Sequence, residues 1–527
     1  MYIKYEGWSV EEDKVEKYFS GCGILFPLQF IRNGVTSKAK TSNMALFCLL
    51  VLFILSGPTM AAEPALPSGL GGGQEESEGQ EPQLPAGLGG GQEAGKKQDD
   101  EPALPQGLAG TGEGAETKKP EQSQGISVWK QALDWPIHGF FDTRVGPRLH
   151  SDSTQSEDAT LAEARLQLET EKYWSGADMQ LDVTTDFVLD GIEEEGDIDL
   201  RRLRLTWTPI SSVDIRAGRQ VLSWGTGDQL FINDLFPKDW QSFLIGRDDE
   251  YLKAPGDAVR VGWFTDLVNF NLVYTPKFDP DRYISGERLS FFHPGLGQIV
   301  GAEHEITTEE PDDWFEDDEW ALRAYRNIGR YTAALYAYFG YWKSPGGTDP
   351  SSGKNIFPEL NVYGASLQGP LGPGIGNIEI GYYDSRKDRG GDDPFINNSE
   401  FRLMAGYEQE LAHELTGSVQ YYLEHIQDYS AYRDTLPAGM QARDENRQVL
   451  TLRLTKLLLN QDLTLSLFTF YSPTDQDIYI RPKASYELTD AWTLEAGGNI
   501  FQGDHDWTFF GQFEDNSNLY AAVRYSF

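Results

Sequence analysis

The stretch Ala177-Asp-Met-Gln-Leu-Asp-Val-Thr-Thr-Asp-Phe-Val-Leu189 decides the fold. Most of its odd-numbered positions are apolar and most of its even-numbered positions are polar. A period of two residues places one kind of side chain on each face of a β-strand. The same alternation recurs at 203–207 and 333–341, so the predicted strands extend well beyond this stretch.

From residue 136 onward the chain contains eighteen predicted strands. The segments between them alternate between short turns and, for the most part, long polar loops. A soluble β-sandwich has the same alternation of side chains. Short turns at one rim and long loops at the other, with an even number of strands, are instead typical of an outer-membrane barrel. The predicted strands are 136–150, 159–174, 176–190, 197–209, 211–221, 256–266, 267–276, 318–329, 330–343, 357–369, 374–386, 399–410, 413–428, 444–458, 461–471, 478–488, 491–502 and 518–527.

We therefore predict an all-β fold, a transmembrane antiparallel up-and-down β-barrel of about 18 strands, with 16 strands as the alternative. Closure leaves no unpaired backbone edge in lipid. Aromatic residues near predicted strand ends would form the interfacial girdles. The chain ends Val523-Arg-Tyr525-Ser-Phe527. A terminal aromatic residue preceded by apolar residues at alternate positions is similar to the signal read by the barrel-assembly machinery of Gram-negative bacteria.

Length and composition exclude several other classes of protein. Outside one short N-terminal run, the 527 residues contain no apolar stretch long enough for a transmembrane helix. The 44 basic and 82 acidic residues give a net charge of -38, which repels nucleic acid. Cys22 and Cys48 both lie before residue 60. A mature chain that begins later therefore has no thiol for a disulfide, a zinc site or a nucleophile.

The first 62 residues contain an export signal. Two lysines precede Met44, an apolar run follows from Ala45 to Leu55, and small residues come next. This is the order of a secretory signal peptide, which we place at 44–62. With Met44 as the start, residues 1–43 are an upstream artefact; the alternative is a genuine extension of unknown role.

Residues 63–125 repeat the motif Glu-Pro-x-Leu-Pro-x-Gly-Leu, beginning at Glu63, Glu81 and Glu101. Proline and glycine at this density bury too little apolar area to offset the entropy of folding. We predict a disordered linker in the periplasm, ahead of a barrel at 126–527. The linker is either a spacer or a linear motif that docks a periplasmic partner or an inner-membrane exporter.

Charged residues are expected on the inner wall. A tight turn about Ile210 would place Arg204 opposite Arg216. Asp182 and Asp186 would lie within about one register step of the arginines on the fourth strand. Such side chains either select permeants by charge or form ion pairs that hold the wall together. The candidate pore-lining residues of the wall are Arg202, Arg204, Arg216, Gln220, Asp182 and Asp186.

The connector from Leu222 to Pro255 is too apolar for a purely solvated loop. It occupies the third-loop position and resembles the general porins in having a loop that could fold inward and narrow the pore. An inward loop would place its aspartates opposite the arginines of the wall. The alternative is an extracellular loop that packs on its neighbours. The candidate aspartates are Asp228, Asp234 and Asp239.

One motif resembles a known family. Gly218-Arg219-Gln220 is followed by Trp224-Gly225. This Gly-Arg-Gln…Trp-Gly motif is similar to that of uncharacterised Gram-negative outer-membrane porin-like barrels, which are often encoded beside RND-type (MMPL) exporters. The resemblance implies a barrel fold and an outer-membrane location, but that family has no settled substrate. The N-terminal repeats are not part of its pattern.

Signatures of enzymes and cofactors are absent from the sequence. The seven histidines occur in none of the hydrolase, zinc-protease or dinucleotide motifs, so we expect no catalytic residue and no cofactor. From Glu309 to Glu319 eight of eleven residues are acidic, without the spacing of an EF-hand. We expect a solvated loop there and no metal site.

These observations together predict a channel for passive diffusion of small solutes across the cell outer membrane. Its expected partners are membrane lipid, lipopolysaccharide and the barrel-assembly machinery, and not nucleic acid. The alternative is an accessory barrel of an envelope RND-type export or lipid-transport complex, docked through the N-terminal repeats.

Overall fold

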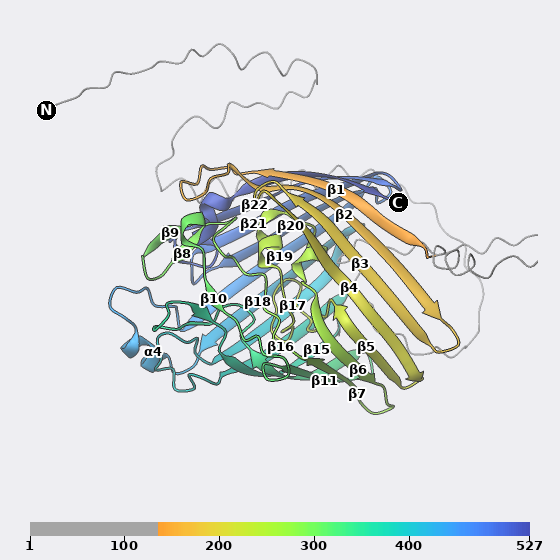
Figure 1. Cartoon of the computed structure of the whole chain (residues 1–527), viewed down its shortest axis with the longest axis horizontal. Coiled ribbons are helices and arrows are strands. Elements are labelled where there is room, and N and C mark those ends of the chain that lie inside the picture. The colour runs from red at the N-terminus through yellow and green to blue at the C-terminus, as the bar shows by residue number, and fades with distance from the viewer. Residues whose placement is uncertain (1–134) are drawn as a thin grey trace, which may run out of the picture. The chain divides into compact units, whose positions relative to one another are not determined.

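The first and last strands of the chain pair with each other, and this pairing closes an eighteen-stranded antiparallel barrel. The computed structural model describes residues 135–527 (Figure 1). The predicted fold class and strand number are confirmed. The strands of the barrel are β1 (Ile137–Pro147), β2 (Ala159–Trp174), β3 (Met179–Asp190), β4 (Glu195–Ile210), β5 (Val213–Gln220), β6 (Gly256–Trp263), β7 (Asn269–Thr275), β11 (Glu319–Ile328), β12 (Tyr331–Tyr341), β15 (Glu359–Leu371), β16 (Gly374–Ser385), β17 (Glu400–Ala412), β18 (Leu415–Ile426), β19 (Asn446–Leu458), β20 (Leu463–Ser472), β21 (Asp477–Thr489), β22 (Trp492–Gly503) and β23 (Asn518–Ser526).

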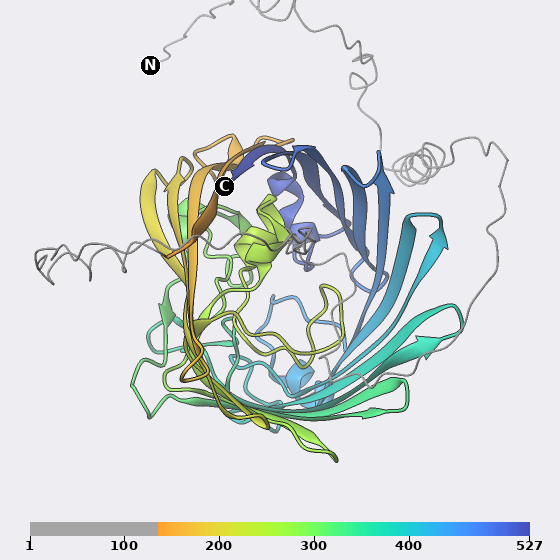
Figure 2. The same cartoon turned by 90° about the vertical axis from the view of Figure 1, so that its right-hand side faces the viewer.

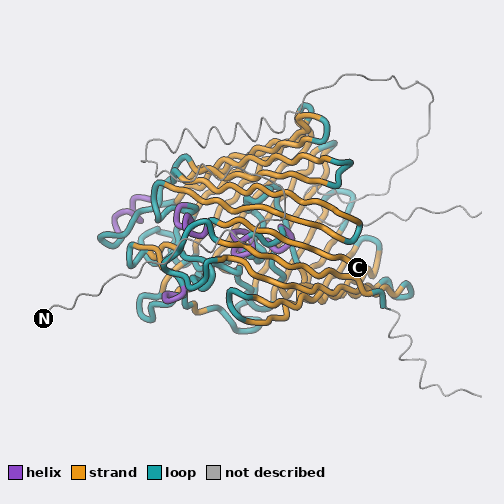
Figure 3. Tube along the Cα trace, turned by 90° about the horizontal axis from the view of Figure 1, so that it is seen from above, coloured by secondary structure: helices purple, strands orange, loops and turns teal. Residues whose placement is uncertain are grey.

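The two rims of the barrel differ in the length of their connections. Figures 1 and 3 show the loops gathered at one rim and tight hairpins at the other, which also holds the C-terminus. The long loops carry short elements of their own: η1 (Asp249–Leu252), β8 (Phe291–His293), β9 (Gln298–Val300), η2 (Ala302–His304), β10 (Thr308–Glu309), β13 (Gly347–Thr348), β14 (Asn355–Ile356), α3 (Trp240–Ile245), α4 (Tyr429–Thr435) and η3 (Gly511–Asn516). No helix within residues 135–527 is long and apolar enough to cross a membrane.

Most strands carry apolar side chains outward, and many of their inward side chains are polar. On β1, Phe141 and Val145 are 46% and 58% exposed, whereas Asp142 and Arg144 between them are buried inside the barrel. This alternation recurs around the wall, and an outward apolar band is what a barrel in lipid requires. The predicted upstream segment 1–43, signal peptide 44–62 and linker 63–125 lie outside the described residues, as does the start of the predicted barrel at 126.

Candidate functional site

The connection between β5 and β6, residues 221–255, lies inside the barrel; we call it L3. In Figure 2 its yellow-green coil and helix α3 lie within the ring of strands. L3 donates or accepts hydrogen bonds on the inner wall at positions far from its own strands in the sequence. Its partners are Glu379 on β16, Gln420 on β18, Arg481 on β21, Arg524 on β23 and Arg144 on β1.

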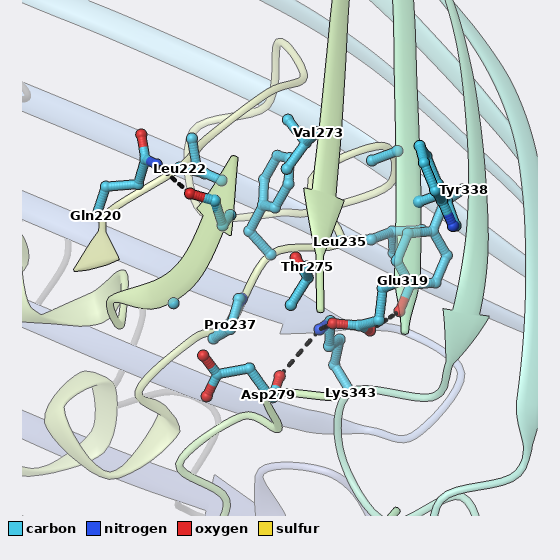
Figure 4. Close-up of a pocket in the computed structure, with 15 residues that line it drawn as sticks. Gln220, Leu222, Leu235, Pro237, Val273, Thr275, Asp279, Glu319, Tyr338 and Lys343 are labelled. Carbon is cyan, nitrogen blue, oxygen red and sulfur yellow. Dashed lines mark hydrogen bonds and ion pairs between the residues drawn. The ribbon is translucent and has the colours of Figure 1, made fainter. Parts of the chain in front are cut away.

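L3 leaves the wall through a tightly packed junction. Gly218 has a φ of 112°, and a Cβ there would lie 2.1 Å from the carbonyl oxygen of Leu203, so only glycine fits. The Gln220 amide donates hydrogen bonds to the backbone oxygens of Gly218 and Ala258, at 3.2 and 3.0 Å. Gln220 is 1% exposed, so its side chain braces the junction instead of facing the lumen (Figure 4).

The outward residue of the same motif also contacts backbone. Arg219 donates a hydrogen bond of 2.8 Å to the carbonyl oxygen of Leu200 and pairs with Asp257 at 3.1 Å. Leu200 lies at a register shift of β4, where a carbonyl is left without its ladder partner. The Gly-Arg-Gln part of the motif therefore stabilises the wall where L3 begins.

A buried carboxylate on β16, five strands from β6 around the wall, holds the first part of L3. Glu379 is 1% exposed and accepts hydrogen bonds from the backbone nitrogen and hydroxyl of Thr226, at 2.7 and 2.9 Å. It also accepts bonds from the backbone nitrogen and side-chain amide of Asn233, at 2.8 and 2.9 Å. Gly225, with a φ of 90°, brings the chain within van der Waals reach of this carboxylate. Trp224 packs edge-on against Phe236.

Glycines in the wall make room for this contact. A Cβ on Gly364 would lie 1.7 Å from Oδ1 of Asn233, and one on Gly381 would lie 2.6 Å from Cγ2 of Ile232. The hydroxyl of Tyr383 donates a hydrogen bond to the carbonyl oxygen of Ile232 at 2.5 Å. L3 therefore occupies a groove made by inward glycines of β15 and β16.

The helix α3 packs against an aromatic part of the wall. Phe243 lies edge-on to Phe470 and Tyr479, with ring centroids 5.7 and 5.4 Å apart. The hydroxyl of Tyr479 donates a hydrogen bond to the carbonyl oxygen of Phe243 at 2.7 Å. Arg144 donates one to the carbonyl oxygen of Gly246, the residue that ends the helix.

Beyond α3, three consecutive carboxylates meet basic side chains of the wall; we call residues 246–252 the L3 tip. Asp249 lies 3.0 Å from Arg481 and 3.4 Å from Lys483, while Asp248 and Glu250 lie 3.3 and 3.4 Å from Arg524. Burial alone would raise the pKa of Asp249, but Lys483 and Arg481 lower it below its usual value.

The pKa of Glu250 changes in the opposite direction. Burial and the neighbouring Asp248 raise its pKa, and Arg524 counteracts them only in part. The L3 tip is therefore an ionic attachment, whereas the Glu379 attachment consists of hydrogen bonds to backbone and side-chain amides and one hydroxyl.

The predicted wall pair Asp182 and Arg204 lies in register, with Arg204 Nη2 2.9 Å from the carboxylate. Arg202 lies opposite Thr184. Asp186 lies two residues along β3 from Thr184, and a register shift after Thr184 pairs Asp186 with Asp199. Asp186 instead binds Arg165 of β2, at 2.7 Å.

The expected pairing of Arg204 with Arg216 is also wrong. Arg204 lies opposite Gly218, and Arg216 opposite Thr206. The turn falls after Ile210, and a register shift between Trp207 and Ile210 accommodates Pro209, which cannot donate a ladder hydrogen bond. The carboxylate partner of Arg216 is its neighbour Asp214, at 2.9 Å.

The three aspartates of L3 do not face the wall arginines of β4 and β5, contrary to expectation. Asp228 lies 3.4 Å from Arg453 of β19. Asp234 pairs with Lys238 at 3.0 Å within L3. Asp239 caps α3 by accepting the Ser242 backbone N–H at 2.7 Å. L3 crosses to the far wall, so its carboxylates find partners there or within the loop.

Charged side chains on the inner wall differ in their access to solvent. The side chains of Arg204 and Arg216 are 21% and 28% exposed, whereas those of Asp182 and Asp186 are 8% and 0% exposed. Glu169 and Glu171 of β2, which lie opposite Thr184 and Asp182, are exposed as well, so the accessible part of this wall carries both signs of charge.

Several inward side chains were not predicted from the sequence. Arg201 lies at the register shift of β4, with its guanidinium 4.3 Å from the ring centroid of Tyr251 in L3. Arg260 and Arg323 follow the alternation of β6 and β11 and could have been found by it.

Figure 4 shows a small cavity between the start of L3 and β11–β12. Its polar end is a buried group: Glu319 accepts a hydrogen bond from Tyr338 at 2.5 Å and pairs with Lys343 at 2.6 Å, and Lys343 also donates to the carbonyl oxygen of Asp279. These groups at the polar end of the cavity satisfy one another. Within residues 135–527 no group of three or more His, Cys, Asp or Glu side chains is arranged to hold a metal ion.

The predicted assembly signal lies at the seam of the barrel. Val523 and Tyr525 face outward, and Tyr525 packs on Trp492 with ring centroids 4.9 Å apart. The backbone of Phe527 exchanges hydrogen bonds with Gly139 of β1, at 2.9 and 3.1 Å. Recognition by the assembly machinery stays a prediction.

No protein-family model matches the chain, and no curated protein matches it. Among solved structures, the outer membrane channel DcaP of Acinetobacter baumannii is 11% identical, with 75% of this chain and 97% of that chain covered and a TM-score of 0.38. OpdL of Pseudomonas aeruginosa is 12% identical, with 75% and 99% covered and a TM-score of 0.44. OccK11 (OpdR) of the same organism is 9% identical, with 75% and 96% covered and a TM-score of 0.44. At these identities and TM-scores the similarity does not extend to a function.

Proposed function

We propose that this chain is a porin-like channel of the outer membrane, which passes small solutes by passive diffusion and uses L3 as its constriction. One observation carries the proposal: L3 is attached to the inner wall at two distant places, Glu379 of β16 and the basic residues of β21 and β23. A closed barrel with an apolar outer face supports the location in a membrane.

The accessible arginines of the wall favour anions locally, beside the exposed carboxylates Glu169 and Glu171 of β2. Arg204 and Arg216 keep part of their guanidinium groups accessible, while Asp182 and Asp186 are buried. A polar lumen lined by accessible cations raises the local concentration of anions and lowers their barrier to passage.

Single-channel recording of the full chain, purified from membranes in detergent and inserted into a planar bilayer under a salt gradient, tests the proposal. We expect discrete current steps with a reversal potential shifted toward anions, and a smaller shift in Arg204→Gln and Arg216→Gln. Arg326→Gln is the matched control, because Arg326 is an exposed outward residue of β11. A correctly folded barrel that gives no steps would refute the channel and would favour a docking role.

A further inference from the structure

We infer that the cavity between the start of L3 and the strands β6, β7, β11 and β12 binds the alkyl chain of a membrane amphiphile. The chain enters sideways, from the outer leaflet of the membrane, and not along the lumen. The inference goes beyond the proposed channel, because this path runs through the wall behind L3 and does not depend on conduction.

The paired wall is low beside this cavity. β6 and β7 pair only over residues 259–263 and 270–274, about 13 Å along the strands. β2 and β3 pair over residues 163–174 and 179–190, about 36 Å along the strands. The apolar band of an outer-membrane barrel is about 25 Å tall. The ladder between β6 and β7 is therefore shorter than the lipid beside it.

Loop residues replace the ladder above β6 and β7. The backbone nitrogen of Asp257 donates a hydrogen bond of 3.2 Å to the carboxylate of Asp279. The backbone nitrogen of Phe315 donates one of 2.8 Å to the carbonyl oxygen of Pro276. Because single bonds of this kind can break without unpairing two strands, this part of the wall can admit a chain from the lipid.

The cavity lies within the thickness of the wall. Ala258, Val273 and Tyr338 line it and are buried in the barrel. Trp320 of β11 also lines it, although its side chain is on the outward face and is 42% exposed. The ring of Trp320 lies against that of Tyr274, with centroids 4.5 Å apart. A residue that borders both the cavity and the lipid marks the side from which a chain enters.

The cavity has a polar end and an apolar end (Figure 4). Thr275 and Glu319, where β7 ends and β11 begins, lie with Lys343 at the polar end, at the rim of long loops. The next inward residues of the two strands, Val273 and Ala321, are apolar. An amphiphile of the outer leaflet has its head group toward the same rim and its chain toward the middle of the membrane. The cavity therefore matches both the polarity and the direction of such a ligand.

A second cavity continues the apolar end. Leu235 and Phe236 of L3 line both cavities, as do Ala321 and Tyr338 of the wall, and the second cavity extends to Val362 of β15. Apolar cavities stay free of water and take up apolar molecules. Both cavities are small. The ligand that fits is therefore a single unbranched chain, which enters by displacing the side chains of Leu235 and Phe236.

Photolabelling of the full chain in phospholipid vesicles tests the site. One probe is dodecanoic acid with a diazirine at its terminal carbon, and the other is a phospholipid with the same group at the end of one acyl chain. We expect both probes to label residues 222–236 of L3, and excess unlabelled dodecanoic acid to reduce this labelling at least 10-fold. Labels confined to outward residues such as Val259 and Leu322 overturn the inference. Labelling of L3 by the fatty acid alone overturns entry from the leaflet.

Variants locate the site. Ala321→Phe fills both cavities, because Ala321 lines both and is 6% exposed. We expect it to lower the labelling of L3 at least 10-fold. Ala324→Phe, on the outward face of the same strand, is the matched control and is expected to leave the labelling unchanged. Labelling at the wild-type level in folded Ala321→Phe overturns the assignment.

Heat-modifiable migration checks the folding of each variant. Ala258→Leu, which adds a smaller side chain to the first cavity, takes the place of Ala321→Phe if that variant does not fold. Labelling of L3 in a barrel that gives no current would refute the channel and keep the site; current without labelling of L3 would do the reverse.

Discussion

The carboxylate of Glu379 on β16 accepts hydrogen bonds from both the backbone nitrogen and the side-chain amide of Asn233 in L3, at 2.8 and 2.9 Å. Asn233 is 146 residues away along the chain and belongs to a different part of the barrel circumference. A single buried acid thus joins the loop to a strand that lies five strands from β6 around the wall.

Glu379→Gln is expected to loosen L3. The amide keeps one acceptor but turns its N–H donors toward the donors of either Thr226 or Asn233, which costs about 2 kcal/mol. This corresponds to a roughly 30-fold larger population of undocked loop. The rate of trypsin cleavage at the basic residues of L3 in the folded barrel measures the population of undocked loop. Glu487→Gln, at an exposed carboxylate on β21, is the control; equal cleavage of the two variants would show that Glu379 does not hold the loop.

Alanine at Gly364 should also displace L3. The new Cβ would meet Oδ1 of Asn233 at 1.7 Å, so Asn233 must move and lose its bonds to Glu379. We expect larger and noisier single-channel currents than in the wild-type chain. Gly176→Ala is the control, because a Cβ there meets nothing within 4 Å. Unchanged currents in Gly364→Ala would mean that the position of L3 does not limit conduction.

Acid should release the L3 tip. The pKa of Asp249 is lowered in the folded protein, so its ion pairs contribute stability above the pKa of the undocked carboxyl, and this contribution is lost as the pH falls through the lowered folded pKa. Glu250, whose pKa is raised, acts in the opposite sense, since its protonation removes repulsion from Asp248. We therefore expect tip mobility to rise mainly below about pH 4.

A spin label on Gln241→Cys, in the helix α3 that leads into the L3 tip, reports the movement of this part of L3, since residues 135–527 contain no cysteine. Asp249→Asn is expected to be mobile already at neutral pH and to show a smaller acid transition. An acid transition of the same size in Asp249→Asn would assign the release to another group.

Removal of Phe527 should affect assembly more than stability. Its side chain is 49% exposed, and its backbone contributes only the last pair of hydrogen bonds at the seam. We expect several-fold less barrel in the outer membrane of cells, with unchanged refolding in detergent. Equal losses in both assays would indicate a folding defect instead of lost recognition.

The sequence was sufficient for the strands but not for their register. The alternation of apolar and polar residues predicts where each strand lies, because the two faces of the wall contact different solvents. The register of two paired strands depends on the exact position of the turn between them and on bulges, and a single residue in either changes the cross-strand partners. The turn predicted about Ile210 falls after that residue, and Pro209 lies inside β4 at a register shift. The extra residue Arg201 shifts the pairing of Asp186 in the same way.

The partners of L3 could not be predicted either. Its apolar content indicated an inward loop, but its anchoring residue Glu379 belongs to a strand whose pattern gives no sign of a loop contact. Gly364 and Gly381 interrupt the row of inward side chains on their strands. That interruption is the one local sign in the sequence that another part of the backbone approaches closely there.

The seam between β1 and β23 is a ladder like the other seventeen, and it differs only in lacking a covalent hairpin. The wall is therefore cyclic in space although the polypeptide is linear. A circular permutant that joins Phe527 to residue 136 and opens the turn between β17 and β18 would keep the same ladders and end the chain with another strand. Such a molecule would show whether β23 acts through its own side chains or through its position at the end of the chain.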